Sequence, residues 1–373
     1  MISFSTGLSN RGLISESFTE KIVKITTEEL LRLFMFAPTQ VQKIPFAGRS
    51  LYIKRDDLIH PQFSGNKARK FQYFLTHEFA HITKLVGYGS AQANSLYSLA
   101  VLAKLKGWKF DYYVSHISDY LLKQPQGNYL AALDSGANII ALDKLVSQEV
   151  ACSEFGAHAS MGLAPLAVPR DSQTQVMPKL ESVMQRLEAT GKDNELYIPE
   201  GGRCEYAREG IELLGEEILQ WAKAQEIEHL VVFFPSGTGT TAVYLQAFFN
   251  QWASSQHKPF IEVHTCSCVG GDEYLLAQFK QLCPQLSHYP TILNTGKKYH
   301  FGKLYLECYQ MWQKVCQTGI EFELLYDPIG FLVLEAALQH RYSHKDTILY
   351  LHQGGVLGNP SMLGRYQRKY PLG

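Results

Sequence analysis

The sequence has no surplus of charge of either sign. Lys+Arg and Asp+Glu balance at 35 each in 373 residues, so no long-range field attracts nucleic acid or an anionic membrane surface. No run approaches the roughly 18 consecutive apolar residues that span a bilayer. The first residues lack the basic start and apolar stretch that are typical of a secretory signal. We therefore expect neither nucleic acid nor membrane as a partner.

Cysteines are few and scattered, and the chain has no internal repeat or low-complexity segment. They are Cys152, Cys204, Cys266, Cys268, Cys283, Cys308 and Cys316. An odd set of seven in a long chain indicates reduced thiols, and hence a cytoplasmic protein. His264, Cys266 and Cys268 share one face of an expected strand and could hold zinc. A fourth ligand and paired cysteine spacing are missing, so we predict buried core thiols and no metal site.

Short β-type runs alternate with amphipathic helical stretches along most of the chain. Strands are expected at 51–54, 85–86, 111–115, 138–142, 230–234, 261–265 and 347–351, and helices at 67–79, 94–106, 128–134, 207–225 and 240–252. The run 230–234 is apolar throughout, as is typical of a central parallel strand buried on both faces. The pattern predicts an α/β fold of parallel sheets flanked by helices, with sites at the carboxyl ends of strands. Residues 152–190 show no clear pattern.

Lys67 follows a Ser-Gly-Asn turn and lies in the first turn of an expected helix. The free N–H groups and positive end of a helix start lower the pKa of a nearby amine. Only a neutral amine attacks an aldehyde, so a lowered pKa suits imine chemistry. The alternative is a surface lysine in a basic helix start, like its neighbour Lys70.

A segment rich in glycine and threonine lies directly after the apolar strand and directly before a helix. Glycines allow backbone amides to converge on an anion, and the helix start adds its dipole. The segment lacks the Gly-Lys-Ser/Thr of a Walker loop and the spacing of the dinucleotide fingerprint. It predicts a phosphate cradle, with a purely structural tight turn as the alternative. The residues of this cradle are Gly237, Thr238, Gly239, Thr240 and Thr241.

Polar residues stand at three other strand ends. Asn94 could reach a cofactor hydroxyl and Ser90 or Ser95 could handle a proton or a carboxylate, although all three also suit helix N-caps. Gln353 precedes a Gly-Gly turn and could bond a ring nitrogen. The stretch Arg55-Asp56-Asp57 could be an acid pair, but we expect these residues to be solvated or locally ion-paired.

Taken in order, the segments resemble the family of 1-aminocyclopropane-1-carboxylate (ACC) deaminase and D-cysteine desulfhydrase. These are pyridoxal 5'-phosphate (PLP) enzymes with the tryptophan synthase β-like fold, also called fold type II. The resemblance spans residues 52–355, and its most specific part is Tyr52–Leu58 followed by Ser64–Lys67. The other segments in family order are Gly127-Asn128, Gly136-Ala137, Ile198–Gly202 and Ser236–Gly239.

The resemblance implies a role for each segment. Lys67 holds PLP as a Schiff base and moves protons at the substrate α-carbon. Residues 237–241 bind the phosphate, and Asn94 meets the phenolic oxygen of the cofactor. Two domains are implied: a large one of residues 1–69 and 199–373, and a small mobile one of residues 70–198 that closes over the substrate. Family members are usually homodimers.

The chain departs from the family where substrate is bound. The family's Gln-Ser-Asn reads Gln92-Ala93-Asn94, and Ser90 lies one turn away from the missing serine. The catalytic tyrosine is replaced by Gly330, with Tyr326 and Tyr299 as other sources of a hydroxyl.

Two further departures lie nearby. Gln353 replaces the family's ring-nitrogen partner, and Arg203 brings a cation to the expected substrate mouth. The candidate substrate residues are Ser90, Gln92, Ala93 and Arg203.

The sequence thus predicts a PLP-dependent lyase or deaminase that acts on a small amino acid by α,β-elimination or deamination, with Lys67 as base. A PLP-binding protein without turnover, serving cofactor homeostasis or regulation, is the first alternative. An amino-acid racemase on the same scaffold is the second.

Overall fold

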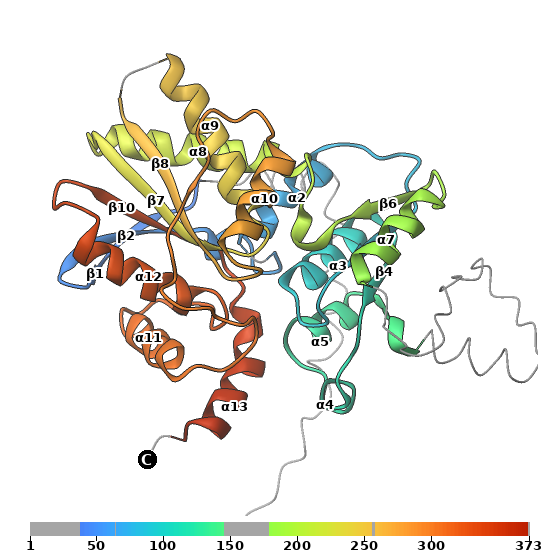
Figure 1. Ribbon diagram of the computed structural model, residues 1–373. Coiled ribbons are helices and arrows are strands. Elements are labelled where there is room, and N and C mark those ends of the chain that lie inside the picture. Colours follow the sequence, from blue (N-terminus) through green and yellow to red (C-terminus); the bar gives the residue numbers. More distant parts are fainter. Residues whose placement is uncertain (1–37, 64, 145–178, 256–257, 372–373) are drawn as a thin grey trace, which may run out of the picture. The chain divides into compact units, whose positions relative to one another are not determined.

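The apolar run predicted at 230–234 lies inside strand β7, in a six-stranded sheet. The computed structural model describes residues 38–63, 65–144, 179–255 and 258–371, and the strand order of this sheet is β1-β2-β10-β7-β8-β9 (Figure 1). The strands are β1 Val41–Phe46, β2 Arg49–Arg55, β7 His229–Ser236, β8 Phe260–Ser267, β9 Thr291–Ile292 and β10 Thr347–His352. All neighbours pair in parallel except β1 and β2, which are antiparallel.

Strand β7 is buried on both faces because helices cover both faces of the sheet. Val231 and Phe233 point into one core with α11 and α12, whereas Val232 and Phe234 point into a second core with α8, α9 and α10. The helices are α8 Ala207–Ala224, α9 Thr240–Ser255, α10 Asp272–Leu282, α11 Leu306–Cys316 and α12 Asp327–His340. The last helix is α13 Asn359–Lys369. An apolar run without alternation is what such a doubly covered strand requires.

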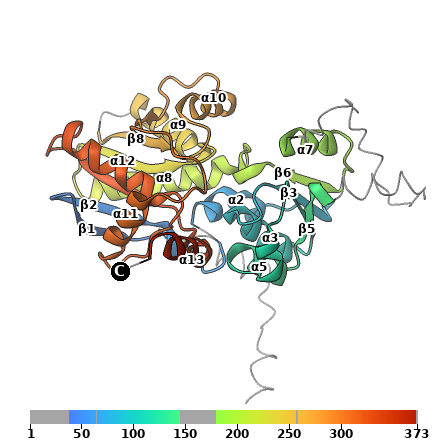
Figure 2. The same cartoon turned by 60° about the horizontal axis from the view of Figure 1, so that its bottom comes forward.

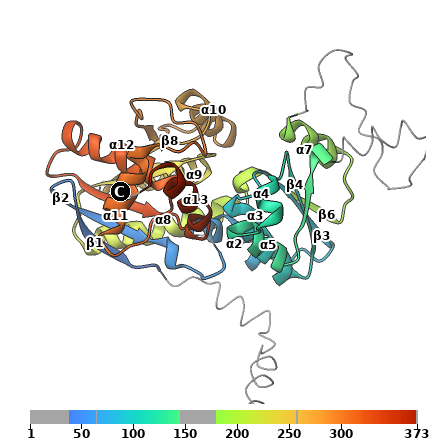
Figure 3. The same cartoon turned by 90° about the horizontal axis from the view of Figure 1, so that it is seen from below.

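A second sheet has four parallel strands in the order β5-β4-β3-β6. They are β3 Lys84–Tyr88, β4 Lys109–Val114, β5 Asn138–Ala141 and β6 Glu195–Ile198. The described helices between β2 and α8 in the chain are α2 Asn66–Thr76, α3 Asn94–Lys106, α4 Asp119–Lys123, α5 Gly127–Asp134 and α7 Leu180–Ala189. Short 3-10 turns are η1 Asp56–Leu58, η2 Glu200–Gly202 and η3 Val356–Gly358. Helices α3 and α5 lie side by side in both turned views (Figures 2 and 3).

The predicted α/β class is confirmed. Helix α3 has the predicted bounds and ends at Gly107, whose left-handed φ of 71° closes the helix. Helix α2 ends at Thr76, three residues earlier than predicted. The predicted domain boundaries stay a prediction, since both sheets belong to one compact unit, Pro38–Gly373. Cys152 lies outside the described residues.

None of the helices in the described ranges is both long and apolar enough to cross a membrane.

Candidate active site

Lys67 lies in the first turn of α2, which packs against the end of β10. Asn66 donates its backbone N–H to Gln353 O at 3.0 Å. A Cβ on Gly65 would lie 2.1 Å from that same oxygen, so only glycine allows the two backbones to approach this closely. The turn before Lys67 is therefore shaped by contact with β10. Ser64, part of the motif, lies outside the described residues.

The amine of Lys67 is half-buried and donates to Asn66 Oδ1 at 3.1 Å. Burial lowers the pKa of the Lys67 amine to about 8. The direction is the one expected from the sequence, but its physical cause is lost solvation rather than the helix start. A pKa this near neutrality leaves part of the amine uncharged and nucleophilic.

Lys70, one turn further along α2, is not the surface lysine that the sequence suggested. It is 3% exposed, and its Nζ donates to Gly201 O at 2.9 Å. Burial and then the charge of Lys67 lower its pKa well below the ordinary value. The two amines therefore lie close enough to influence each other.

The predicted phosphate loop connects the end of β7 to the start of α9. Gly239 has a φ of 73°, and a Cβ there would lie 2.5 Å from the Phe279 ring, so the loop needs glycine to pack on α10. The hydroxyls of Thr238 and Thr240 lie 3.1 Å apart. Within the described residues the hydroxyl of Thr241 is buried and has no hydrogen-bond partner. A buried unpartnered donor at a helix start is what a bound anion would satisfy.

Gln353 joins the Lys67 segment to the phosphate loop. Its Oε1 accepts from Asn66 Nδ2 at 2.8 Å, and its Nε2 donates to Pro235 O, also at 2.8 Å. Both ends of the predicted ring-nitrogen partner are thus engaged by protein atoms. A second connection between α2 and the loop runs through Gly201. Its carbonyl oxygen accepts from Lys70, and a Cβ on it would lie 3.0 Å from Thr238 Cγ2.

Asn94 is held in one orientation by Asn128, a residue to which the sequence gave no role. Asn128 is 2% exposed, and its Nδ2 donates to Asn94 Oδ1 at 2.7 Å. Asn94 Nδ2 is left as a donor and lies 2.5 Å from the point where a Cβ on Gly355 would stand. The Gly127-Asn128 pair in family order was the only sequence signal for this arrangement.

Three of the four predicted substrate residues hydrogen-bond other protein groups. Ser90 is exposed, and its hydroxyl accepts from the backbone N–H of Gln92 at 3.3 Å. Gln92 Oε1 accepts from Ser361 at 3.0 Å, and Ala93 precedes α3 without a side-chain cap. Arg203 instead donates to Gln281 at 2.8 Å.

The guanidinium of Arg203 also lies 3.6 Å from a carboxylate oxygen of Glu181. The predicted cation is therefore already paired.

The position of the missing tyrosine is tightly packed. A Cβ on Gly330 would lie 3.0 Å from both Pro235 Cδ and Tyr350 Oη, so a side chain there would have to displace these neighbours by a few tenths of an ångström. Of the two other tyrosines, Tyr326 has its hydroxyl 3.4 Å from the point where a Cβ on Gly237 would stand. Tyr299 instead packs edge-on against Tyr305. Tyr326 is therefore the tyrosine beside the phosphate loop.

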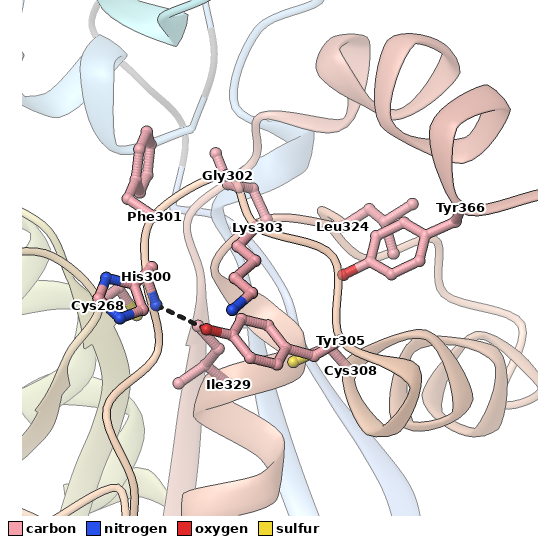
Figure 4. A pocket seen from close by; sticks show the side chains of 11 residues that line it. Cys268, His300, Phe301, Gly302, Lys303, Tyr305, Cys308, Leu324, Ile329 and Tyr366 are labelled. Carbon is pink, nitrogen blue, oxygen red and sulfur yellow. Dashed lines mark hydrogen bonds between the residues drawn. The ribbon is translucent and has the colours of Figure 1, made fainter. Parts of the chain in front are cut away.

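A small pocket is lined by Phe301 and Cys268 among others, and none of the predicted site residues lines it (Figure 4). Its wall residue Phe301 packs on Tyr326 with ring centroids 5.5 Å apart. Cys268 also lines it and, like Cys266, is buried in the core as predicted. His264 is bonded to Tyr342 at 2.6 Å. Among the described residues no group of three or more potential ligands could hold a metal ion.

The acidic stretch after β2 is only partly as expected. Arg55 and Asp57 form the local ion pair, at 2.7 Å. Asp56 is not solvated: it is 1% exposed and receives two bonds of 3.0 Å from Arg69 in α2. Arg69 also donates to Glu217 in α8 at 2.6 and 2.9 Å. This buried network anchors the helix that carries Lys67.

No protein-family model matches the chain, and no curated protein sequence does. Solved structures do match. An ACC deaminase homologue has a TM-score of 0.64 and 20% identity over 90% of this chain and 98% of its own.

A threonine deaminase from T.th. has a TM-score of 0.55 and 15% identity, covering 88% of this chain and 96% of its own. A hydrogen sulfide-producing enzyme from Fusobacterium nucleatum has a TM-score of 0.53 and 12% identity, covering 88% and 98%.

The chain has the tryptophan synthase β-like fold. The fold expected from the resemblance is thus confirmed, with its two parallel-rich sheets flanked by helices.

Proposed function

We propose that the protein is a PLP-dependent lyase or deaminase that acts on a small amino acid. The observation that carries the proposal is the half-buried amine of Lys67, tied through Gln353 to a loop with an unpartnered buried hydroxyl at Thr241. The similar structures support it, since they are named as a deaminase homologue, a threonine deaminase and a hydrogen sulfide-producing enzyme.

The residues present fit PLP. Lys67 would hold the aldehyde carbon, and the loop from Gly237 to Thr241 would hold the phosphate, with the Thr241 hydroxyl as one donor. Asn94 Nδ2, oriented by Asn128, would donate to the phenolic oxygen. Bound PLP withdraws electrons from the α-carbon of an amino acid and so acidifies its proton.

The protein's own groups then have three tasks. Lys67 takes and returns the α-proton, which requires the lowered pKa that burial produces. The side-chain oxygen Oδ1 of Asn66 accepts a hydrogen bond from the Lys67 amine and so holds it in place. The hydroxyl of Tyr326 lies beside the phosphate loop and is our candidate for the acid–base role of the tyrosine that Gly330 replaces.

Gln353 as ring-nitrogen partner stays a prediction: its amide bonds Asn66 and Pro235 and keeps one N–H and one lone pair for a further partner. The substrate roles of Ser90, Gln92, Ala93 and Arg203, the homodimer and the cytoplasmic location also stay predictions.

A PLP-binding protein without turnover is the second candidate. Two observations favour it: the tight packing at Gly330 and the loss of the serine at Ala93. Racemisation is a further outcome on the same scaffold.

The first experiment locates the cofactor. Wild-type protein incubated with PLP should show the visible absorption of lysine-bound cofactor, and borohydride reduction followed by peptide mapping should find the label on Lys67 and not on Lys70. Lys67→Ala should lose the reducible absorption, while Lys123→Ala, an exposed control in α4, should keep it. Retention of the reducible band in Lys67→Ala would overturn the proposal.

A second experiment separates the candidate functions. Release of ammonia, a keto acid or sulfide from any member of a panel of D- and L-amino acids supports a lyase or deaminase. Exchange of the α-proton with inversion but without release supports a racemase. Neither product nor exchange supports binding alone.

A further inference from the structure

Glu323 is a buried carboxylic side chain in the loop before α12, 6% exposed, to which sequence reasoning assigned nothing. Its Cγ lies 3.1 Å from the point where a Cβ on Gly355 would stand. Asn94 Nδ2 lies 2.5 Å from that same point. The side chains of Glu323 and Asn94 therefore both lie beside Gly355, in the turn after β10. Asn94 is the residue whose amide we assign to the phenolic oxygen of PLP.

The groups around Glu323 are acidic or neutral. Its Oε2 accepts from the backbone N–H of Tyr326 at 2.5 Å, and its own N–H donates to Asp327 Oδ2 at 2.9 Å. Asp327 Oδ1 in turn accepts from Tyr350 Oη at 2.7 Å. In the described part of the chain no cation lies within ion-pair distance of Glu323.

The remaining titratable neighbours do not neutralise the carboxyl. The Cys268 thiol and the Tyr326 phenol both lie close enough to feel its charge, and His352 at the end of β10 acts on Asp327 instead.

Burial, and then the charge of Asp327, raise the pKa of Glu323 to about 8. A buried carboxylate without a cation is costly, so the group keeps its proton at neutral pH. It can then donate a proton, whereas an ordinary carboxylate can only accept one.

We propose that Glu323 is a further acid–base group of this site, distinct from Lys67, and exchanges its proton with the ligand oxygen that Asn94 contacts. The inference rests on the proposed function, because that oxygen belongs to PLP. The proton passes from a Glu323 carboxyl oxygen to the ligand oxygen, which leaves a carboxylate, and it returns by the reverse step. No electron is transferred, and no bond between heavy atoms forms or breaks.

A purely structural role for Glu323 makes a different prediction. Tyr326 is the N-cap residue of α12, so Glu323 could serve only to bind the helix start. Glu323→Gln separates the two roles, because the amide oxygen still accepts from Tyr326 N–H but the side chain no longer exchanges a proton. Glu321→Gln is the matched control, since Glu321 is exposed and bonds Asn359 through one oxygen.

The test uses the PLP-loaded full chain and two readouts. The visible absorption is recorded from about pH 6 to about pH 10, and the exchange of glycine α-protons is followed by NMR in D₂O. We expect Glu323→Gln to bind PLP as wild type does, to lose the absorption change centred near the pKa of Glu323, and to slow exchange at least about tenfold. Glu321→Gln should match wild type in both readouts.

Three results would overturn the inference or its basis. If loaded Glu323→Gln keeps both the absorption change and the exchange rate, Glu323 only caps α12. If Glu323→Gln does not fold, the wild-type titration decides, since the absence of any absorption change in that pH range contradicts the proposal. If wild type takes up no PLP at all, the proposed function fails before any variant is compared.

Discussion

The environment of Thr241 favours a bound ligand. Its hydroxyl is buried at the start of α9 and, in the described part of the chain, has no partner. Polar atoms buried in this way are rare in folded proteins, because each costs about 1–3 kcal/mol. A bound phosphate oxygen would remove that cost.

This environment yields a prediction at residue scale. Thr241→Val should weaken PLP binding by about tenfold or more, since a hydrogen bond to a charged group is worth about 1.5–3 kcal/mol. Thr241→Ser should bind nearly as wild type does. Pyridoxal, which lacks the phosphate, should bind the valine variant and the wild type equally in an absorbance titration. An equal loss for pyridoxal and PLP would show that Thr241 does not act on the phosphate.

At the scale of elements, the position of α2 depends on charges buried between it, β2 and α8. The network has two cations and two carboxylates. Arg69 bonds both Asp56 and Glu217, and Lys54 bonds Glu217, all at 2.6–3.0 Å. Helix α2 also touches α8 directly, because a Cβ on Gly210 would lie 2.0 Å from Arg69 O. Lys67 lies two residues before Arg69 in α2, so the contacts that fix the position of α2 also fix that of Lys67.

Loss of one member of the network should be costly. Arg69→Met leaves the buried carboxylate of Asp56 without its main partner, and we expect a loss of about 3–5 kcal/mol in the free energy of unfolding. Lys314→Met, which removes an exposed partner of Glu335, should cost about 1 kcal/mol or less. Urea unfolding of the two variants measures the difference, and equal losses would contradict the role of the network.

The same network predicts how stability responds to acid. Burial alone would raise the pKa of Asp56, but Arg69 and then Lys54 hold it below the ordinary value. A carboxyl with a lowered pKa in the folded state adds stability above its unfolded pKa and loses it as the pH falls through the folded one. The acid side of the stability profile should therefore be flatter in Asp56→Asn than in wild type, as urea midpoints at several pH values would show.

At the scale of the whole molecule, cofactor and fold should be thermodynamically linked. A ligand that binds only the folded chain adds about 2.7 kcal/mol at one hundred times its Kd. We therefore expect PLP to raise the melting temperature by several degrees in calorimetry. The rise should be smaller in Lys67→Ala, and inorganic phosphate should reproduce only part of it. A melting temperature unaffected by PLP would contradict specific binding.

Local features of the sequence were enough to predict much of this architecture. The apolar run in β7 predicted a strand covered on both faces, and Gly107 predicted the end of α3. The glycines and threonines before α9 predicted a turn between a strand and a helix, where they lie, and phosphate binding by this turn stays a prediction. Each of these depends on the chemistry of a few consecutive residues, such as hydrophobic periodicity or a left-handed φ.

Other features depend on residues that are far apart in the chain and could not be predicted. Asn66 meets Gln353, 287 positions away, and Asn94 meets Asn128, 34 positions away. The burial of Asp56, Lys70 and Glu323 follows from packing of this kind, and no local pattern distinguishes them from surface charges. The sequence could therefore propose Lys67 and the loop as candidates, whereas the environment that sets the protonation of each group arises only when distant segments exclude water together.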